Sequence, residues 1–165
     1  MKHLSCISLF CFALFSMAQE QSSLLQMYTV EEMLIQQVKQ PRPVVVFVHT
    51  NWCKYCKMMD KNTFTDSRVI QLLNTSFYFV KFDAESKEEV VVNGKSLQYK
   101  LSGYRSGIHE FAERIAKKNN TVAFPTTVVL NKSLHIDLQV NSFLSADSLN
   151  SLLLRYLQET TKTSD

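Results

Sequence analysis

The sequence predicts an α/β fold, with a central mixed sheet of four to five strands and helices on both faces of the sheet. The continuous apolar run Val44–Val48 and the largely apolar run Phe77–Asp83 predict two central strands, because strands buried on both faces are rich in apolar residues. Segments with helical spacing precede and follow these runs, and this alternation is typical of a sheet covered by helices. The chain has 165 residues, of which 45% are hydrophobic, so it can bury one sizeable core.

Two helices are expected around the first strand. Thr29 and Glu32 have the spacing of a capping box, and apolar residues then recur at helical spacing to about Gln40, where two prolines end the pattern. After the strand, a second helix is expected to start at Cys53 and to continue, straight or kinked, through Leu73.

Residues 86–121 are expected to form an ordered insert with its own hairpin and helix. Asn93-Gly94 lies between two β-rich runs, which is a strong signal for a two-residue hairpin turn. Ser106 is expected to cap a helix, whose apolar face would consist of Ile108, Phe111, Ala112, Ile115 and Ala116.

The rest of the chain is expected to add two strands and a final helix. A strand starts at Pro125, and residues 134–140 form its antiparallel neighbour. Ser145 then caps a helix with one apolar stripe, and the tail after Glu159 is expected to fray. No repeat or linker indicates a second domain.

The N-terminal residues 1–18 are expected to be a secretory signal peptide. A short basic start is followed by an apolar run, and small residues precede a cleavage site after Ala18. The apolar run is short for a membrane span, although an uncleaved anchor is the alternative. A lipoprotein is disfavoured because Phe10 precedes Cys11, where a small residue is needed. Residues 19–165 would then be one exported domain, periplasmic or secreted.

Cleavage would leave Cys53 and Cys56 as the only cysteines, because Cys6 and Cys11 belong to the signal. A bridge between them closes a very short loop, which stabilises a fold less than a long loop does. A zinc site built on cysteines would need more ligands, and the sequence has no second CxxC. An exported domain with one CxxC therefore indicates thiol–disulfide chemistry.

The chain resembles the thioredoxin superfamily from Thr29 to Glu159. The likeness is carried by the apolar strand that leads into Trp52-Cys53-x-x-Cys56, by Phe124-Pro125-Thr126, and by the closing two strands and helix. Residues 56–69, CKMMDKNTFTDSRV, are similar to the C-terminal periplasmic domain of DsbD-type disulfide interchange proteins. Secreted thioredoxin-like proteins of Bacteroidetes are also similar.

This resemblance implies roles for the residues near the cysteines. Cys53, nearer the helix start and more exposed, would attack a substrate disulfide, and Cys56 would resolve the mixed disulfide. Trp52 would flank the pair and contribute to substrate docking. A cis bond before Pro125 would place this proline against the cysteines, and the backbone of Phe124 would pair with an extended substrate segment.

Several nearby groups are expected to tune the cysteines. The helix N-terminus would lower the pKa of Cys53, and Lys54 and Lys57 would act in the same direction unless they simply face water. His49 would influence the thiolate or move a proton, or be a partly exposed strand end. Lys81 resembles the usual lysine of the family.

One family feature is missing from the sequence. A buried aspartate, which accepts the proton of the resolving thiol in thioredoxins, is replaced by Phe47. Glu85 or water is the expected substitute. The residues between the cysteines, Lys54-Tyr55, match neither Gly-Pro of reducing thioredoxins nor Pro-His of strong oxidants, so they leave the direction of electron flow open.

These observations predict an exported thiol–disulfide oxidoreductase acting on proteins, on the reductase or isomerase side. It would use no organic cofactor, and a membrane-bound donor would return its electrons. The net charge of +3 is scattered, which argues against nucleic acid as a partner. Two alternatives are a copper or other soft-metal chaperone using Cys53, Cys56 and His49, and a binding module without catalysis.

Overall fold

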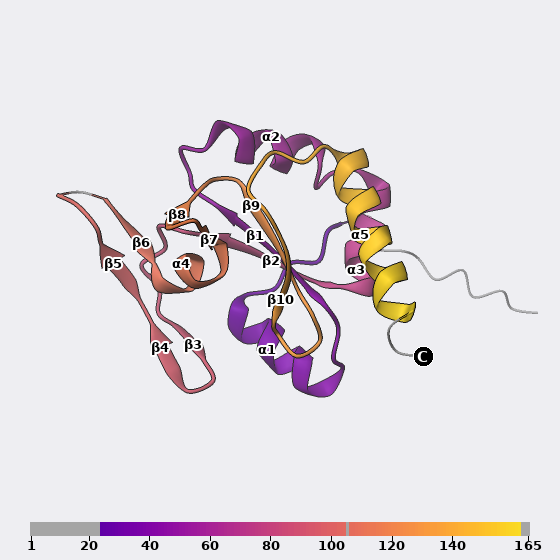
Figure 1. Ribbon diagram of the computed structural model, residues 1–165, viewed down its shortest axis with the longest axis horizontal. Coiled ribbons are helices and arrows are strands. Elements are labelled where there is room, and N and C mark those ends of the chain that lie inside the picture. Colours follow the sequence, from indigo (N-terminus) through magenta and orange to yellow (C-terminus); the bar gives the residue numbers. More distant parts are fainter. Residues whose placement is uncertain (1–23, 105, 163–165) are drawn as a thin grey trace, which may run out of the picture.

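The computed structural model describes residues 24–104 and 106–162, so the predicted signal segment 1–18 lies outside the described residues (Figure 1). Its central sheet has four strands in the order β10-β9-β1-β2. The strands are β1 (Val44–His49), β2 (Tyr78–Asp83), β9 (Thr126–Leu130) and β10 (Ile136–Val140). β1 and β2 are parallel, whereas β9 runs antiparallel to both β1 and β10. The predicted mixed sheet is therefore confirmed.

Strand β1 lies in the interior of the sheet, and its apolar run explains this position. The residues from Val44 to Val48 are fully buried. Val46 is paired with Val80 on one side and with Val128 on the other, so its main chain is bonded to two strands. Side chains alternate between faces along a strand, so β1 supplies core residues to both layers of helices.

We call one side of the sheet the cysteine face. It is covered by α2 (Lys54–Asn62), α3 (Ser67–Ser76) and α5 (Ala146–Lys162), which Figure 1 shows together on one side. Its core comprises both cysteines with Val45, Phe47, Met59, Phe64, Val69, Leu73, Phe77, Phe79, Val129, Leu149, Leu153 and Tyr156.

We call the opposite side the insert face. It is covered by α1 (Val30–Lys39), by α4 (Glu110–Ala116) and by the hairpin of β3 (Val90–Val92) and β4 (Lys95–Leu97). The predicted capping box is present at the start of α1, where Glu32 N–H donates to Thr29 Oγ1 at 3.1 Å and Thr29 N–H donates to Glu32 Oε2 at 2.8 Å. The core of this face includes Met33, Val46, Val48, Val80, Phe82, Phe111, Ala112 and Val128.

The segment 86–121 is more elaborate than predicted. The turn at Asn93-Gly94 joins β3 to β4, as expected, and both of its residues have positive φ. Two further short pairs follow, β5 (Tyr99–Leu101) with β6 (Gly107–His109), and β7 (Lys117–Lys118) with β8 (Thr121–Val122). Figure 1 shows the first two hairpins projecting beside α4.

The prediction that Ser106 caps the insert helix is wrong. Residues 107–109 pair with β5 instead, so Ile108 belongs to a strand and α4 begins only at Glu110. His109 is the cap, because its Nδ1 accepts from the N–H of Phe111 at 3.0 Å. A contact between two strands thus overrides the helical spacing of the sequence.

The helix that was expected to run from Cys53 through Leu73 is two helices. α2 ends at Asn62, and Asp66 caps α3 by accepting from the N–H groups of Arg68 and Val69. Thr63, in the break, donates its hydroxyl to the carbonyl of Leu144 at 2.7 Å. The break therefore ties the cysteine helix to the loop before α5.

The C-terminal helix is as predicted at its start and longer at its end. Ser145 Oγ accepts from the N–H of Ser148 at 3.2 Å, and the helix continues to Lys162, past the expected fraying at Glu159. Among the described residues, no helix has the length and apolar character needed to cross a membrane.

Candidate active site

The two cysteines lie where β1 leads into α2, and they form a disulfide. A turn follows His49, and the N–H of Cys53 donates to the carbonyl of Thr50 at 3.2 Å. Cys53 is the N-cap of α2, and its Sγ accepts from the N–H of Cys56 at 3.1 Å. A sulfur at this position is exposed to the positive end of the helix dipole.

Both cysteines are buried. Cys53 is 4% exposed and Cys56 is 1% exposed. Cys53 is therefore the more exposed of the two, as expected, but the difference is small. Both side chains belong to the core of the cysteine face, in which Phe47 and Met59 are also found. A substrate sulfur must therefore approach the disulfide past neighbouring side chains.

Four aromatic side chains form two ring contacts next to the cysteine segment, and we call them the aromatic rim: Trp52, Tyr55, Phe124 and Phe143. Trp52 is 65% exposed, and its ring contacts Phe124 edge-on with 5.8 Å between centroids. Tyr55 and Phe143 lie 6.4 Å apart. Phe143 comes from the loop before α5, and no local pattern in the sequence marks it as part of the site. Exposed aromatic side chains around a reactive group are typical of a protein-binding surface.

Phe124 and Pro125 lie at the start of β9. Their peptide bond is cis, and the side chain of Pro125 is buried. The ladder between β9 and β1 ends at the pair Thr126–Val48, so the main chain of Phe124 lies beyond it. Phe124 is also the partly buried residue that packs against the cores of both faces.

Sequence reasoning missed Asp60, which holds Lys81. Lys81 Nζ lies 2.8 Å from each carboxylate oxygen of Asp60, and the side chains are 30% and 33% exposed. Asp60 lies one helical turn after Cys56 on α2, whereas Lys81 is paired in the sheet with Phe47. The carboxylate that pairs with Lys81 therefore comes from the helix and not from position 47. The spacing of four residues between Cys56 and Asp60 was the available signal.

Glu85, expected as a substitute for the missing carboxylate, has a different partner. Its Oε1 accepts from the indole N–H of Trp52 at 3.1 Å. This bond holds the exposed indole beside the cysteines. Glu85 thus helps to hold the aromatic rim in place.

His49 is half-buried next to the Asp60–Lys81 pair. Its ring stacks on Phe47 with 5.7 Å between centroids. Burial lowers the pKa of His49 from its ordinary 6.5, and the charge of Lys81 lowers it further, while Asp83 and Asp60 act in the opposite direction. The imidazole is therefore neutral at neutral pH and has the capacity to accept a proton.

The remaining tuning residues predicted from sequence are at the surface. Lys54 and Lys57 are exposed, and neither forms an ion pair among residues 24–104 and 106–162. They contribute positive charge on the first turn of α2 without being held in place. The part of the chain that the structure describes also contains no group of three metal-ligating side chains.

Comparison with known proteins places this geometry in context. The model of the thioredoxin-like domain family matches residues 30–156. A DsbH oxidoreductase structure is 14% identical, with a TM-score of 0.59, and the match covers 88% of this chain and 92% of that one. A thioredoxin from Thermus thermophilus is 18% identical, with a TM-score of 0.60, covering 86% and 93%.

A third solved structure, a disulphide isomerase from Xylella fastidiosa Temecula1, is 16% identical, with a TM-score of 0.53. That match covers 78% of this chain and 88% of the isomerase. Among curated proteins, none matches the chain significantly. At these identities the solved structures establish the fold.

Proposed function

The chain belongs to the thioredoxin-like domain family, and on this premise we propose that it is an exported thiol–disulfide oxidoreductase that exchanges disulfides with other proteins. The observation that carries the proposal is the Cys53–Cys56 disulfide at the N-terminus of α2. The aromatic rim around it supports a protein as the substrate, since a small thiol would need no such surface.

In the reducing direction, the Cys53 thiolate attacks one sulfur of a substrate disulfide. A mixed disulfide forms, and the other substrate sulfur leaves as a thiolate. The Cys56 thiolate then attacks Cys53 Sγ, which releases the second substrate sulfur and restores the Cys53–Cys56 disulfide. Two electrons have moved from the protein to the substrate, so no organic cofactor is required.

Substrate binding is proposed to occur on the main chain at Phe124. An extended segment of the substrate would add to the end of β9, beyond the pair Thr126–Val48, by main-chain hydrogen bonds. Trp52 and Tyr55 would flank the substrate cysteine on either side. Glu85 supports this role, because its bond to the indole holds Trp52 in place.

The attack by Cys56 requires the loss of its thiol proton. Asp60 is proposed to take this proton, directly or through water, because it lies one turn further along the same helix. Lys81 holds the carboxylate in place, and neutral His49 beside them is a second acceptor.

Export, the reducing direction and the electron donor are also part of the proposal. The apolar run before Ala18 supports export through a signal peptide. An exported reductase must be recharged, because the bacterial periplasm is kept oxidising, and a membrane-bound donor is the natural source of electrons.

An equilibrium redox titration tests the proposal. The purified protein is equilibrated in thiol–disulfide buffers, and the free thiols of Cys53 and Cys56 are counted by alkylation. The fluorescence of Trp52, the only tryptophan, is an independent signal. A potential of roughly −200 mV or below supports a reductase, whereas one near about −120 mV indicates a disulfide donor. If no reversible disulfide forms, the proposal fails.

A trapping variant tests the two cysteine roles. With Cys56→Ser, the mixed disulfide between Cys53 and a substrate cannot be resolved, so covalent adducts accumulate that reductant releases. With Cys53→Ser, the same adducts are expected to be nearly absent. Equal trapping by both variants would contradict the assignment of Cys53 as the attacking residue.

A further inference from the structure

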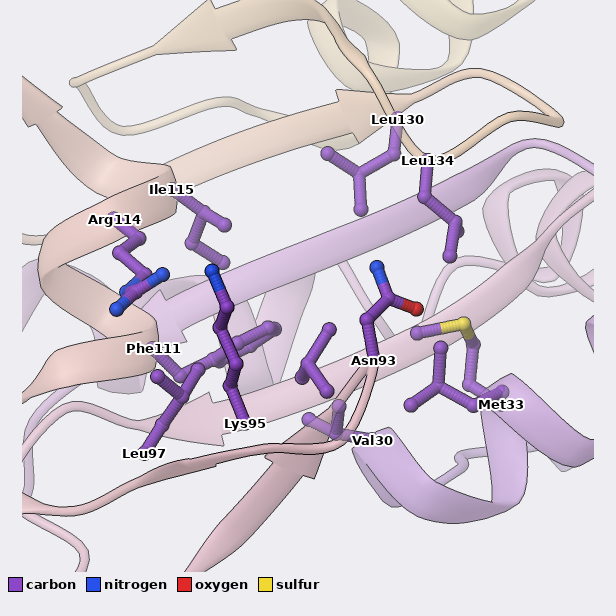
Figure 2. A pocket seen from close by; sticks show the side chains of 12 residues that line it. Val30, Met33, Asn93, Lys95, Leu97, Phe111, Arg114, Ile115, Leu130 and Leu134 are labelled. Atoms are coloured by element: carbon purple, nitrogen blue, oxygen red, sulfur yellow. The ribbon is translucent and has the colours of Figure 1, made fainter.

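A cavity lies on the insert face, on the opposite side of the sheet from the cysteines. Its volume is about 250 Å³, and it is enclosed by α1, the β3–β4 hairpin, α4 and the turn between β9 and β10. The walls are apolar, and they include Met33, Leu97, Ile115, Leu130 and Leu134, which Figure 2 shows around the space.

Two cationic side chains also line this cavity. Lys95 comes from β4 and Arg114 from α4, and Figure 2 shows their nitrogen atoms on the same side of the cavity. The amide of Asn93, on the hairpin turn, is the third polar group of the lining. All three polar side chains are exposed, so a ligand can reach them from solvent.

Neither cation is neutralised by the protein. Among the described residues, the side chains of Lys95 and Arg114 form no hydrogen bond or ion pair. Arg114 interacts through space with Glu110, but that carboxylate is paired with Lys100. The lining therefore combines an apolar interior with two unpaired positive charges and an amide.

We propose that this cavity binds a small amphipathic carboxylate, with the apolar tail between α1 and α4 and the carboxylate on Lys95 and Arg114. A guanidinium and an ammonium are suited to hold one carboxylate by charge-assisted hydrogen bonds. The volume is below the roughly 300–1,000 Å³ of sites for drug-sized ligands, so a single short acyl chain is the appropriate size.

The site is independent of the redox reaction. Its lining belongs to the core of the insert face, whereas the cysteines belong to the core of the cysteine face. Binding should therefore be equal in the disulfide form, in the reduced form and in the variant with both Cys53→Ser and Cys56→Ser. This separates failure of the binding proposal from failure of the proposed oxidoreductase function.

The test uses decanoate below its micellar concentration as the probe. Binding is followed by methyl NMR and calorimetry on the purified protein. The methyl signals of Ile115 and Leu134 are expected to shift, while those of Leu153 on the cysteine face stay in place. The double variant Lys95→Ala, Arg114→Ala should weaken binding at least about ten-fold, because both charged partners of the carboxylate are lost.

Two controls make the result specific. Lys118→Ala removes an exposed lysine of the same insert that does not line the cavity, and it should leave decanoate binding unchanged. Decanol has the same tail without the charge and should bind at least about ten-fold more weakly.

Three outcomes would overturn the proposal. The first is equal binding of decanol and decanoate, and the second is unchanged decanoate binding in the double variant. The third is displacement of decanoate by a short apolar peptide that binds more tightly when its C-terminal carboxylate is free. That result would assign the cavity to a peptide terminus.

Discussion

The two faces of the sheet share the same strands but are closed in different ways. The cysteine face is covered by three helices of nine or more residues, α2, α3 and α5. On the insert face, α1 is accompanied by a seven-residue helix, α4, and by strands of two or three residues. All these elements depend on packing, because isolated helices below about 12–15 residues and isolated two-stranded hairpins are marginal in water. The shorter elements of the insert face depend on packing the most.

The difference in covering elements goes together with a different feature on each face, the disulfide on one and the cavity on the other. On the cysteine face a buried disulfide lies at the start of α2, and this helix is anchored in the core by Cys56 and Met59. On the insert face, packing of short elements leaves a cavity lined by unpaired charges. A fixed geometry suits a reaction between positioned atoms, and the short elements of the insert face leave space for a small ligand.

Truncating one phenylalanine on each face of β2 should give the largest effect. Phe79 packs on Phe64 with 4.9 Å between centroids on the cysteine face, and Phe82 packs on Phe111 with 4.8 Å on the insert face. Phe79→Ala and Phe82→Ala should each lower the free energy of unfolding by about 3–5 kcal/mol, because each leaves a cavity. Urea denaturation measures both losses.

The two variants should destabilise different parts of the molecule, and this difference distinguishes the two faces. Phe82→Ala is expected to speed proteolysis within residues 86–121 and to leave the potential of the disulfide unchanged. Phe79→Ala is expected to shift that potential, while the rate of proteolysis within residues 86–121 stays the same as in the unmodified protein. If both variants opened the insert equally, the two faces would be one cooperative unit, and the comparison above would be wrong.

His109 should give the next largest effect, because it connects the insert to the sheet. The ring is fully buried, Nδ1 accepts from the N–H of Phe111 at 3.0 Å, and Nε2 lies 2.9 Å from the carbonyl of Glu88. Since Nδ1 is an acceptor, Nε2 carries the proton and donates to Glu88. His109→Ala should cost about 2–3 kcal/mol in unfolding free energy, measured by urea denaturation.

The matched variant is His109→Asn. Asparagine is a good N-cap, so it should recover about 1 kcal/mol of the loss. The disulfide potential should be unaffected by either change. No recovery with asparagine would mean that the cap contributes little and that the ring is needed only for packing against Phe82.

The central part of the fold could be predicted from sequence because its signals are local. The apolar run of β1, the capping box at Thr29 and the Asn93-Gly94 turn each depend on a few adjacent residues. The position of Cys53 at the helix start is local in the same way, since it follows directly from the strand before it.

The features that sequence reasoning missed depend on distant contacts. The cap at His109 exists only because residues 107–109 pair with β5, which no spacing within the helix reveals. Phe143 joins the aromatic rim from a loop far along the chain. Asp60 was missed because its partner, Lys81, lies on another element, although its spacing from Cys56 was visible.

Asp60→Asn should have a moderate effect, on kinetics and not on folding. Removing the carboxylate takes away the proposed proton acceptor for Cys56 and should slow the resolving step by about ten-fold. This is less than the roughly hundred-fold or more of a sole general base, because His49 and water remain as acceptors. Stopped-flow measurement of mixed-disulfide decay reports the step directly.

The control for Asp60 is a carboxylate on the insert face. Glu113 pairs with Lys117 across one helical turn of α4, at 2.9 Å. Glu113→Gln should leave the resolving rate unchanged. An equal effect of the two variants would mean that charge, and not position next to Cys56, determines the rate.

The smallest expected effect is a pH dependence of stability from His49. Its pKa in the folded protein lies below 6.5, with burial as the main cause, Lys81 acting in the same direction, and Asp83 and Asp60 opposing. Between the folded pKa and about 6.5, the unfolded chain binds more protons than the folded protein. Stability is therefore full above about 6.5 and falls as the pH is lowered through this window.

Urea midpoints at pH 7.5 and 5.5 measure this slope, in a range where carboxylates titrate little. His49→Gln removes the titrating group and should reduce the drop in midpoint between the two pH values. His135→Gln, at an exposed site, should retain the full drop. If His49→Gln kept the full drop as well, the stability change would arise elsewhere, and a neutral, proton-accepting His49 beside Asp60 would lose its support.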